Sequence, residues 1–156
     1  VATMTITNQE KVNSFAVDLS NSIYVLTSGH TGSGTPPRLV KLNISGGVDT
    51  SFATSGVYSF LATDRAEDIA IDASGRVIVV GATAPQSPSD LKIWRFNSNG
   101  TLDTSFNSVG FATHAVYVAE AASAVKIDSN GKILVLGAVG DGTANDSQMA
   151  MWRFNP

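Results

Sequence analysis

The chain has 156 residues, a formal net charge of −3 and no cysteine, with 43% apolar and only 15% charged residues. This length is enough for one domain with a core of ordinary size. The composition excludes disulfides, thiolate metal sites and a cysteine nucleophile. It also lacks the basic excess of nucleic-acid binding proteins, and no apolar run approaches the ~18–20 residues of a membrane helix.

Short runs of β-branched and aromatic residues, bounded by turn residues, predict strands along the whole chain. The first strand is expected at 3–7, and the next complete set at 57–61, 69–72, 77–82 and 91–97. A further outer strand is expected at 111–116. No segment sustains an apolar period of 3.6 residues, so the sequence predicts an all-β fold.

An internal repeat organises these strands. An apolar-Asp-turn-apolar block recurs with its anchor at Asp18, Asp72 and Asp128, at spacings of 54 and 56 residues. A second block follows each copy and ends in Leu-Asn or Trp-Arg-Phe-Asn, and an Asp-Thr-Ser-Phe block appears at 49–52 and 103–106. A four-strand unit of about 50 residues is the blade period of a β-propeller.

The repeated aspartates are expected to shape turns. Asp72 and Asp128 begin hairpin turns of the form Asp-x-x-Gly, and Asn21 replaces the glycine in the first copy because it tolerates the same backbone conformation. Asp49 and Asp103 are expected to accept a backbone N–H two or three residues further on. The phenylalanines of the same blocks are expected to anchor these turns in the core: Phe52 and Phe106.

The motif Asn97-Ser-Asn-Gly-Thr-Leu-Asp-Thr-Ser-Phe, then Gly110-Phe and Ile127-Asp-Ser-Asn-Gly-Lys-Ile-Leu-Val-Leu-Gly, resembles the delta-60 repeat family. The resemblance covers nearly the whole chain. It implies bacterial β-propeller-type repeats, common in large exported or surface proteins, and brings no catalytic motif with it. The first copy departs most from the pattern: Leu42 replaces Phe, Ser22 replaces Lys or Arg, and Ser28 replaces Gly.

We therefore expect a single domain over 1–156, built from approximate units 1–54, 55–108 and 109–156 as three four-stranded antiparallel blades. By analogy with related propellers, the strand before each Asp-x-x-Gly turn is innermost. The last blade then lacks its own outer strand, and segment 3–7 offers a spare one.

Three blades are too few to close a ring, since propellers typically have four to eight. One hypothesis is a homo-oligomer, with a six-blade dimer favoured over a nine-blade trimer. The other is a piece of a longer propeller. The start at Val1 without a visible signal peptide is consistent with a mature or excised chain.

Candidate ligand-binding residues come from the segments that differ between repeats, because ligand-contacting loops diverge while scaffold positions repeat. These segments are 28–37, 83–90 and 139–148, and 7–14, 63–68 and 117–123. Under the expected strand order, both sets emerge at the same end of the blades. The candidates are His30, Asp64, Arg65, Glu67, Asp68, Gln86, Asp90, Tyr117, Glu120, Asp141, Asn145 and Asp146.

No catalytic set, metal site or cofactor is predicted. His114 has no acidic neighbour in sequence, no Gly-x-Ser-x-Gly motif is present, and segment 140–146 lacks the regular spacing of a calcium loop. The acidic segment 63–68 would suit glycoside hydrolysis only if two carboxylates were held ~5–9 Å apart. Trp94 and Trp152, each beside an arginine, are expected to pack between blades rather than to stack on sugars or bases.

Three functions remain open. The favoured hypothesis is a non-catalytic binding or adhesion module of a secreted or surface bacterial protein, with a glycan or a surface protein as ligand. No nucleic-acid partner and no membrane insertion are expected. The second hypothesis is a purely structural or oligomerising propeller unit. The third and least favoured is a glycan-active enzyme.

Overall fold

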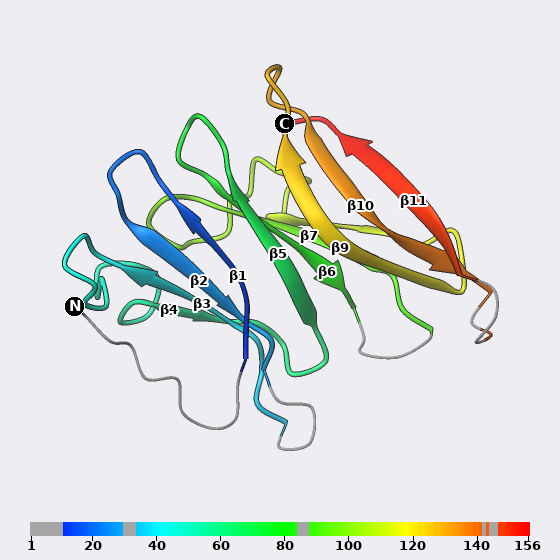
Figure 1. Cartoon of the computed structure of the whole chain (residues 1–156), viewed down its shortest axis with the longest axis horizontal. Coiled ribbons are helices and arrows are strands. Elements are labelled where there is room, and N and C mark those ends of the chain that lie inside the picture. The colour runs from blue at the N-terminus through cyan, green and yellow to red at the C-terminus, as the bar shows by residue number, and fades with distance from the viewer. Residues whose placement is uncertain (1–10, 30–33, 84–87, 142, 144–146) are drawn as a thin grey trace.

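A computed structural model describes residues 11–29, 34–83, 88–141, 143 and 147–156. Within these residues the chain forms eleven strands, and no helix there could cross a membrane. The strands make three antiparallel sheets that follow one another in chain order, with β5 lying between β1 and β9 (Figure 1).

Sheet 1 contains β1 (Val12–Val17), β2 (Ile23–Thr27), β3 (Arg38–Leu42) and β4 (Val57–Ser59), in that order. Sheet 2 repeats this order with β5 (Arg65–Ile71), β6 (Val77–Ala82), β7 (Leu91–Phe96) and β8 (Phe111–His114). Sheet 3 contains β9 (Ala119–Ile127), β10 (Ile133–Gly140) and β11 (Ser147–Phe154), and β11 is its edge among the described residues. The all-β architecture of blade-like sheets is thus confirmed. Segment 3–7 lies outside the described residues.

The predicted strands are found within a few residues of their expected bounds. The strand expected at 77–82 is β6 without change, and those expected at 57–61, 91–97 and 111–116 end earlier. The strand expected at 69–72 starts at Arg65, because the register shifts between Ala66 and Asp68 and leaves Glu67 as a bulge. The bulge interrupts the alternation of apolar and polar residues, so the sequence pattern did not indicate that the strand begins at Arg65.

The same bulge recurs in the first strand of every sheet. In β1 the register shifts across Asn13, and in β9 it shifts between the partners of Leu136 and Gly137. Gly81 of β6 lies opposite Ala66, and a Cβ there would collide with the carbonyl oxygen of Arg65. In sheet 1 this position belongs to Thr27 rather than Ser28 as the sequence suggested, because Thr27 is the residue that pairs with Val12.

Each sheet packs one face against the next sheet, so the core lies between sheets. The first cluster joins sheet 1 to sheet 2 and includes the fully buried Tyr24, Leu26 and Phe96. The second cluster joins sheet 2 to sheet 3 through residues such as Val80 and Val125. The predicted anchors Phe52 and Phe106 are both buried, one in each cluster.

The predicted turns are also present, and their geometry follows from local side-chain hydrogen bonds. Oδ1 of Asp72 accepts the backbone N–H groups of Ser74 and Arg76 at 2.9 and 3.0 Å. Asp18 and Asp128 accept the equivalent pairs in the other two sheets. Asn21 has φ of 60°, which is the left-handed backbone conformation expected of the residue that replaces the turn glycine.

Candidate functional site

The loops that differ between repeats do emerge at one end of each sheet, here called the loop end. Antiparallel register places the end of β2 beside the starts of β1 and β3, and the start of β3 beside the end of β4. Sheet 2 has the same arrangement. The β2–β3 and β4–β5 connections, and their counterparts in sheet 2, therefore leave the sheets in the same direction.

Several of the candidate residues lie in strands rather than in loops, which corrects the sequence-based expectation. The candidates in strands are Arg65, Glu67 and Asp68 of β5 and Glu120 of β9. Because these residues are charged, the beginnings of β5 and β9 were predicted to be polar connections rather than strands. The candidates in connections are Asp64, Asp90, Tyr117 and Asp141. The remaining four lie outside the described residues: His30, Gln86, Asn145 and Asp146.

Asp64 belongs to a buried ion pair. Its Oδ1 lies 3.1 Å from Nζ of Lys92, and its Oδ2 accepts the backbone N–H of Leu61 at 3.1 Å. The Lys92 ammonium also lies over the rings of Trp94 and Phe111, at 4.9 and 4.8 Å from their centroids. The carboxylate thus closes the β4–β5 connection onto sheet 2, a structural contact that leaves it 6% exposed.

Asp68 joins all three sheets. Its Oδ1 accepts the hydroxyl of Ser14 in sheet 1 at 2.6 Å, and its Oδ2 accepts the backbone N–H of Val125 in sheet 3 at 2.8 Å. Both carboxylate oxygens are therefore used in holding neighbouring first strands together. Charge-assisted hydrogen bonds of this kind are among the stronger polar contacts in a folded protein.

Glu67, the bulge residue of β5, is held between two partners. Its Oε1 accepts from Nε and Nη2 of Arg65 at 2.9 and 2.6 Å. Nδ2 of Asn13, the bulge residue of β1, donates to its Oε2 at 3.4 Å and to the carbonyl of Ala66 at 2.7 Å. The repeated bulges thereby bring the first strands of sheets 1 and 2 into polar contact.

Glu120 is fully buried and pairs with His114, a contact that sequence spacing did not indicate. Its Oε2 lies 2.7 Å from Nδ1 of His114, and its Oε1 accepts the N–H groups of Val116 and Tyr117 at 2.8 Å. Burial by itself would raise the pKa of Glu120. The hydrogen bonds from His114 and from the two backbone N–H groups outweigh it and lower that pKa.

His114 also meets sheet 3, since its ring contacts Trp152 edge-on with centroids 6.1 Å apart. The pair of His114 and Glu120 therefore seals the junction of β8 and β9. Asp64 and Glu120 occupy the same place in successive repeats, each accepting N–H groups of the connection that precedes it. Lys92 supplies the cation in one case and His114 the ring nitrogen in the other.

Three described candidates remain at the surface. Tyr117 is 54% exposed, and Asp90 is half-buried, with the hydroxyl of Thr83 accepting its backbone N–H. Asp141 is exposed, and the backbone and side-chain hydrogen bonds of Thr143 lower its pKa. Among the described residues, no group of three or more His, Asp or Glu side chains could hold a metal ion.

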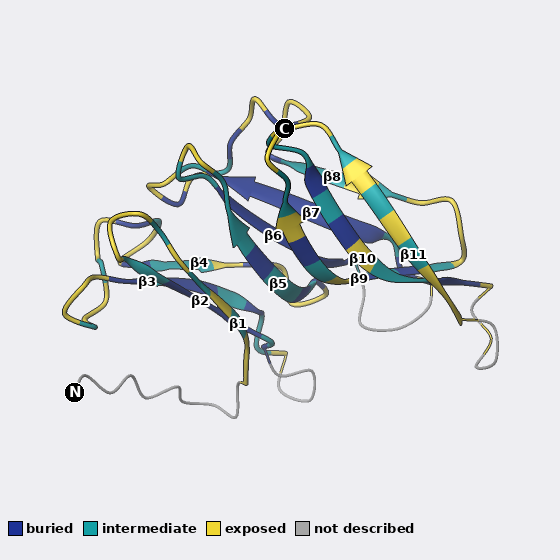
Figure 2. Ribbon diagram, turned by 45° about the horizontal axis from the view of Figure 1, so that its top comes forward, coloured by how far each residue is buried: buried dark blue, intermediate teal, exposed yellow. Residues whose placement is uncertain are grey.

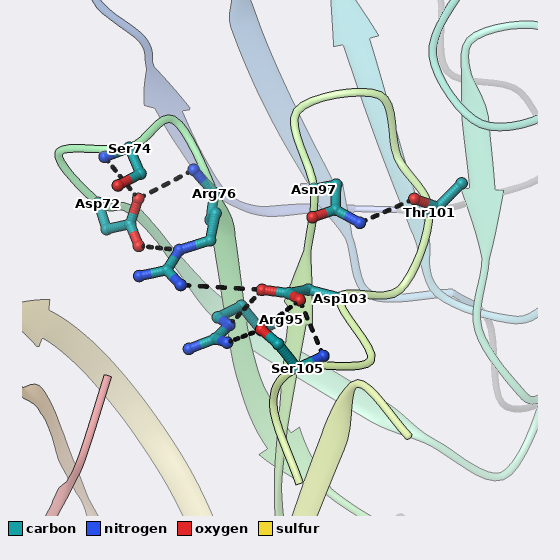
Figure 3. A network of polar contacts seen from close by, with 8 residues as sticks. All are labelled: Asp72, Ser74, Arg76, Arg95, Asn97, Thr101, Asp103 and Ser105. Atoms are coloured by element: carbon teal, nitrogen blue, oxygen red, sulfur yellow. Dashed lines mark hydrogen bonds and ion pairs between the residues drawn. The ribbon is translucent and has the colours of Figure 1, made fainter. Parts of the chain in front are cut away.

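The opposite end, here called the turn end, carries a polar network on sheet 2 (Figure 3). Asp103 accepts the backbone N–H and hydroxyl of Ser105 at 3.0 and 2.7 Å, as its sequence position predicts. Nε of Arg95 donates to Oδ2 of Asp103 at 2.8 Å, and Nη1 of Arg76 lies 3.8 Å from the same atom. Burial alone would raise the pKa of Asp103, but the hydrogen bonds from Ser105 and Arg95 lower it.

A groove of about 510 Å³ lies between the turns of sheets 1 and 2 at this end. Its carboxylates, Asp18 and Asp72, each use Oδ1 to accept two backbone N–H groups of their own turns. Oδ2 of Asp72 is paired with Nε of Arg76 at 2.6 Å. The carboxylates of the groove therefore shape turns.

Exposed residues lie along β11 at the edge of sheet 3 (Figure 2), and several exposed residues on the strands of sheets 1 and 3 are large and apolar. On β10 and β11, Leu136, Met149 and Met151 are 45%, 88% and 69% exposed. On β1, Phe15 and Val17 are 66% and 51% exposed. Contiguous exposed apolar residues of this kind mark sites of association. The repeat alignment places Met149 and Met151 in the last strand block but makes no prediction of their exposure.

The chain was compared with protein families, solved structures and curated proteins. A family model described as "Domain of unknown function (DUF5122) beta-propeller" matches residues 73–106. A solved structure of a protein of unknown function from Bacteroides caccae aligns with 97% of this chain at 13% sequence identity and a TM-score of 0.48. The alignment covers 48% of that structure, so this chain spans about half its length. No curated protein matches. The sheets and the family match support a β-propeller-type repeat.

Proposed function

We propose that this chain is a non-catalytic structural unit that self-associates to complete a β-propeller-type ring. The observation that carries the proposal is the apolar surface left open on the two outermost sheets. Met151 is 69% exposed, whereas Leu39 and Ile93, which take the same register position in sheets 1 and 2, are fully buried. Association that removes these apolar side chains from water is favourable.

The ring needs more sheets than the described chain provides. Propellers have four to eight blades, so two copies with three sheets each would give six and fall within that range. C₂ dimers are also the commonest symmetric assemblies of identical chains. We therefore propose a dimer.

The loop end supports a ligand-binding role less well. Asp64, Asp68 and Glu120 have their carboxylate oxygens engaged in internal contacts, and Glu67 is paired with Arg65. Binding or adhesion through Asp90, Tyr117 and Asp141 stays a prediction, as does a secreted or surface location in bacteria. Membership of the delta-60 repeat family is proposed on the quoted motifs and is consistent with the narrower family match.

Light scattering on a size-exclusion column tests the assembly proposal. We expect a particle of twice the chain mass of 16.2 kDa, which dissociates on dilution as mass action requires. A folded monomer over the whole soluble concentration range would overturn the proposal and favour a piece of a longer propeller. A trimer would contradict the six-blade stoichiometry.

A further inference from the structure

Deepening the proposed function, on which the inference rests, we infer that the chains join head to tail. The open face of sheet 3 would receive the open face of sheet 1 of a second copy. The partner is a second copy of this chain, because the two faces are the unmatched halves of an interface that the molecule already contains twice.

The first step is that both internal interfaces use the same register positions. Between sheets 1 and 2, Leu26 and Leu39 of one sheet pack with Ile69 of the next. Between sheets 2 and 3, the equivalent residues are Val80 and Ile93 on one side and Val125 on the other. The first strand of each later sheet accordingly contacts the second strand of the sheet before it, β5 against β2 and β9 against β6.

The second step concerns the receiving side on sheet 3. Leu136 and Met151 lie opposite one another in β10 and β11 and occupy the positions of Val80 and Ile93. They are 45% and 69% exposed, whereas Val80 and Ile93 are fully buried. We call Leu134, Leu136, Met149 and Met151 the open face of sheet 3. Methionine side chains suit such a contact because they adapt to an irregular partner.

The third step concerns the inserting side on sheet 1. Phe15 takes the position of Ile69 and Val125 in the first strands of sheets 2 and 3. It is 66% exposed, against 4% and 1% for those two residues. Directly across sheet 1 it is followed by Val25 and Val40. The open face of sheet 1 is the exposed pair Phe15 and Val17. Behind it in the same rows lies a third apolar cluster, made of the buried Val25, Val40 and Leu42 and the half-buried Ile23 and Val57.

The receiving side is also hollow. A depression of about 460 Å³ is lined by Leu134, Met151, Trp152 and the ion-paired Asp128 and Arg153. A hollow in an apolar sheet face provides space for a side chain from another surface. Phe15, on the face that matches this one by repeat position, offers a large apolar side chain that is already exposed.

Because the two faces differ, the contact is heterologous, and it closes into a dimer when a rotation of 180° returns the second copy to the first. Each dimer then contains two identical interfaces. A symmetric contact of either face with itself would reproduce neither internal interface.

Lysine substitutions separate these arrangements. We expect Phe15→Lys and Met151→Lys each to weaken the dimer roughly 30-fold or more per interface, as for a central interface residue. An equimolar mixture should regain dimers, because each mixed pair has one interface without a lysine. Leu61→Lys is the control, since Leu61 is an exposed apolar residue of the β4–β5 connection and should leave the mass unchanged. Circular dichroism confirms that each variant is folded.

The native chain has no cysteine, which allows a second measurement. Phe15→Cys and Leu136→Cys chains, one of them tagged, should give mixed disulfide dimers in preference to either self-pair, and Ala73→Cys should pair with neither. A dimeric wild type in which only one lysine variant dissociates, or in which self-pairs dominate, would overturn the head-to-tail arrangement and leave the proposed function standing. A monomeric wild type would overturn both.

Discussion

Asp68 offers a direct test of how the sheets are held together, since its carboxylate contacts sheets 1 and 3 from sheet 2. A hydrogen bond to an ionised group contributes ~1.5–3 kcal/mol to stability. Because both contacts are half-buried, the lower value applies to each, and Asp68→Ala should reduce the free energy of unfolding by about 3 kcal/mol. The variant also leaves the N–H of Val125 without its acceptor.

Two further variants divide this loss into its parts. Asn at position 68 can still accept from Val125 and can donate to the rotatable hydroxyl of Ser14, so Asp68→Asn should cost about 1 kcal/mol. Ser14→Ala removes one of the two contacts and should cost about 1.5 kcal/mol. Asp90→Ala is the matched control at the same end, with an expected change within about 0.5 kcal/mol.

Urea titration followed by tryptophan fluorescence gives these values, provided that all variants are compared at one protein concentration. A loss below about 1 kcal/mol for Asp68→Ala would refute the reasoning, because it would mean that the two contacts have no net effect. An equal loss for Asp68→Asn and Asp68→Ala would show that charge, rather than hydrogen-bond geometry, determines the stability.

Three other predictions concern single contacts. Because the pKa of Glu120 is lowered, its contribution to stability is present above the ordinary value of 4.5 and is lost as the pH falls through the depressed value. In thermal melts, the melting temperature of Glu120→Gln should therefore fall less steeply with decreasing acidic pH than that of the wild type. Lys92→Met should cost about 3 kcal/mol in urea titration because it leaves buried Asp64 without its cation, and adding Asp64→Asn should recover part of that loss; an unchanged midpoint would contradict the ion-pair argument. Gly81→Ala should cost about 3 kcal/mol in the same titration, because a Cβ there collides with the Arg65 carbonyl and the backbone must shift. Gly75→Ala, with φ of 76° but open space around it, should cost only about 1 kcal/mol.

The repeat predicted the strands and turns because both depend on nearby residues. The turn at Asp72 is formed by its own carboxylate and two N–H groups within four residues, and those at Asp18 and Asp128 follow the same spacing. Phe52 and Phe106 were predicted to lie in the core for a related reason. A large apolar residue that recurs at the same repeat position is expected to have the same buried surroundings in each repeat.

The roles of the charged residues depended on contacts far apart in the chain, which spacing does not encode. Asp68 meets the N–H of Val125 across 57 residues, and Asp64 meets Lys92 across 28. The bulge at Glu67 additionally disguised the beginning of β5. Residues at the same repeat position also differ in burial when one sheet is covered by a following sheet and another is not. Periodicity alone therefore could not show that Met151 of sheet 3 is exposed while Ile93 of sheet 2 is buried.

The connections between sheets have a thermodynamic consequence of their own. Only residues 60–64 separate β4 from β5, and residues 115–118 separate β8 from β9. Such short tethers give adjoining sheets a high effective concentration for one another, so their packing is insensitive to dilution. The outer faces of sheets 1 and 3 have no such tether among the described residues. Protein concentration should therefore govern the cohesion of an assembled ring while leaving the three-sheet arc intact.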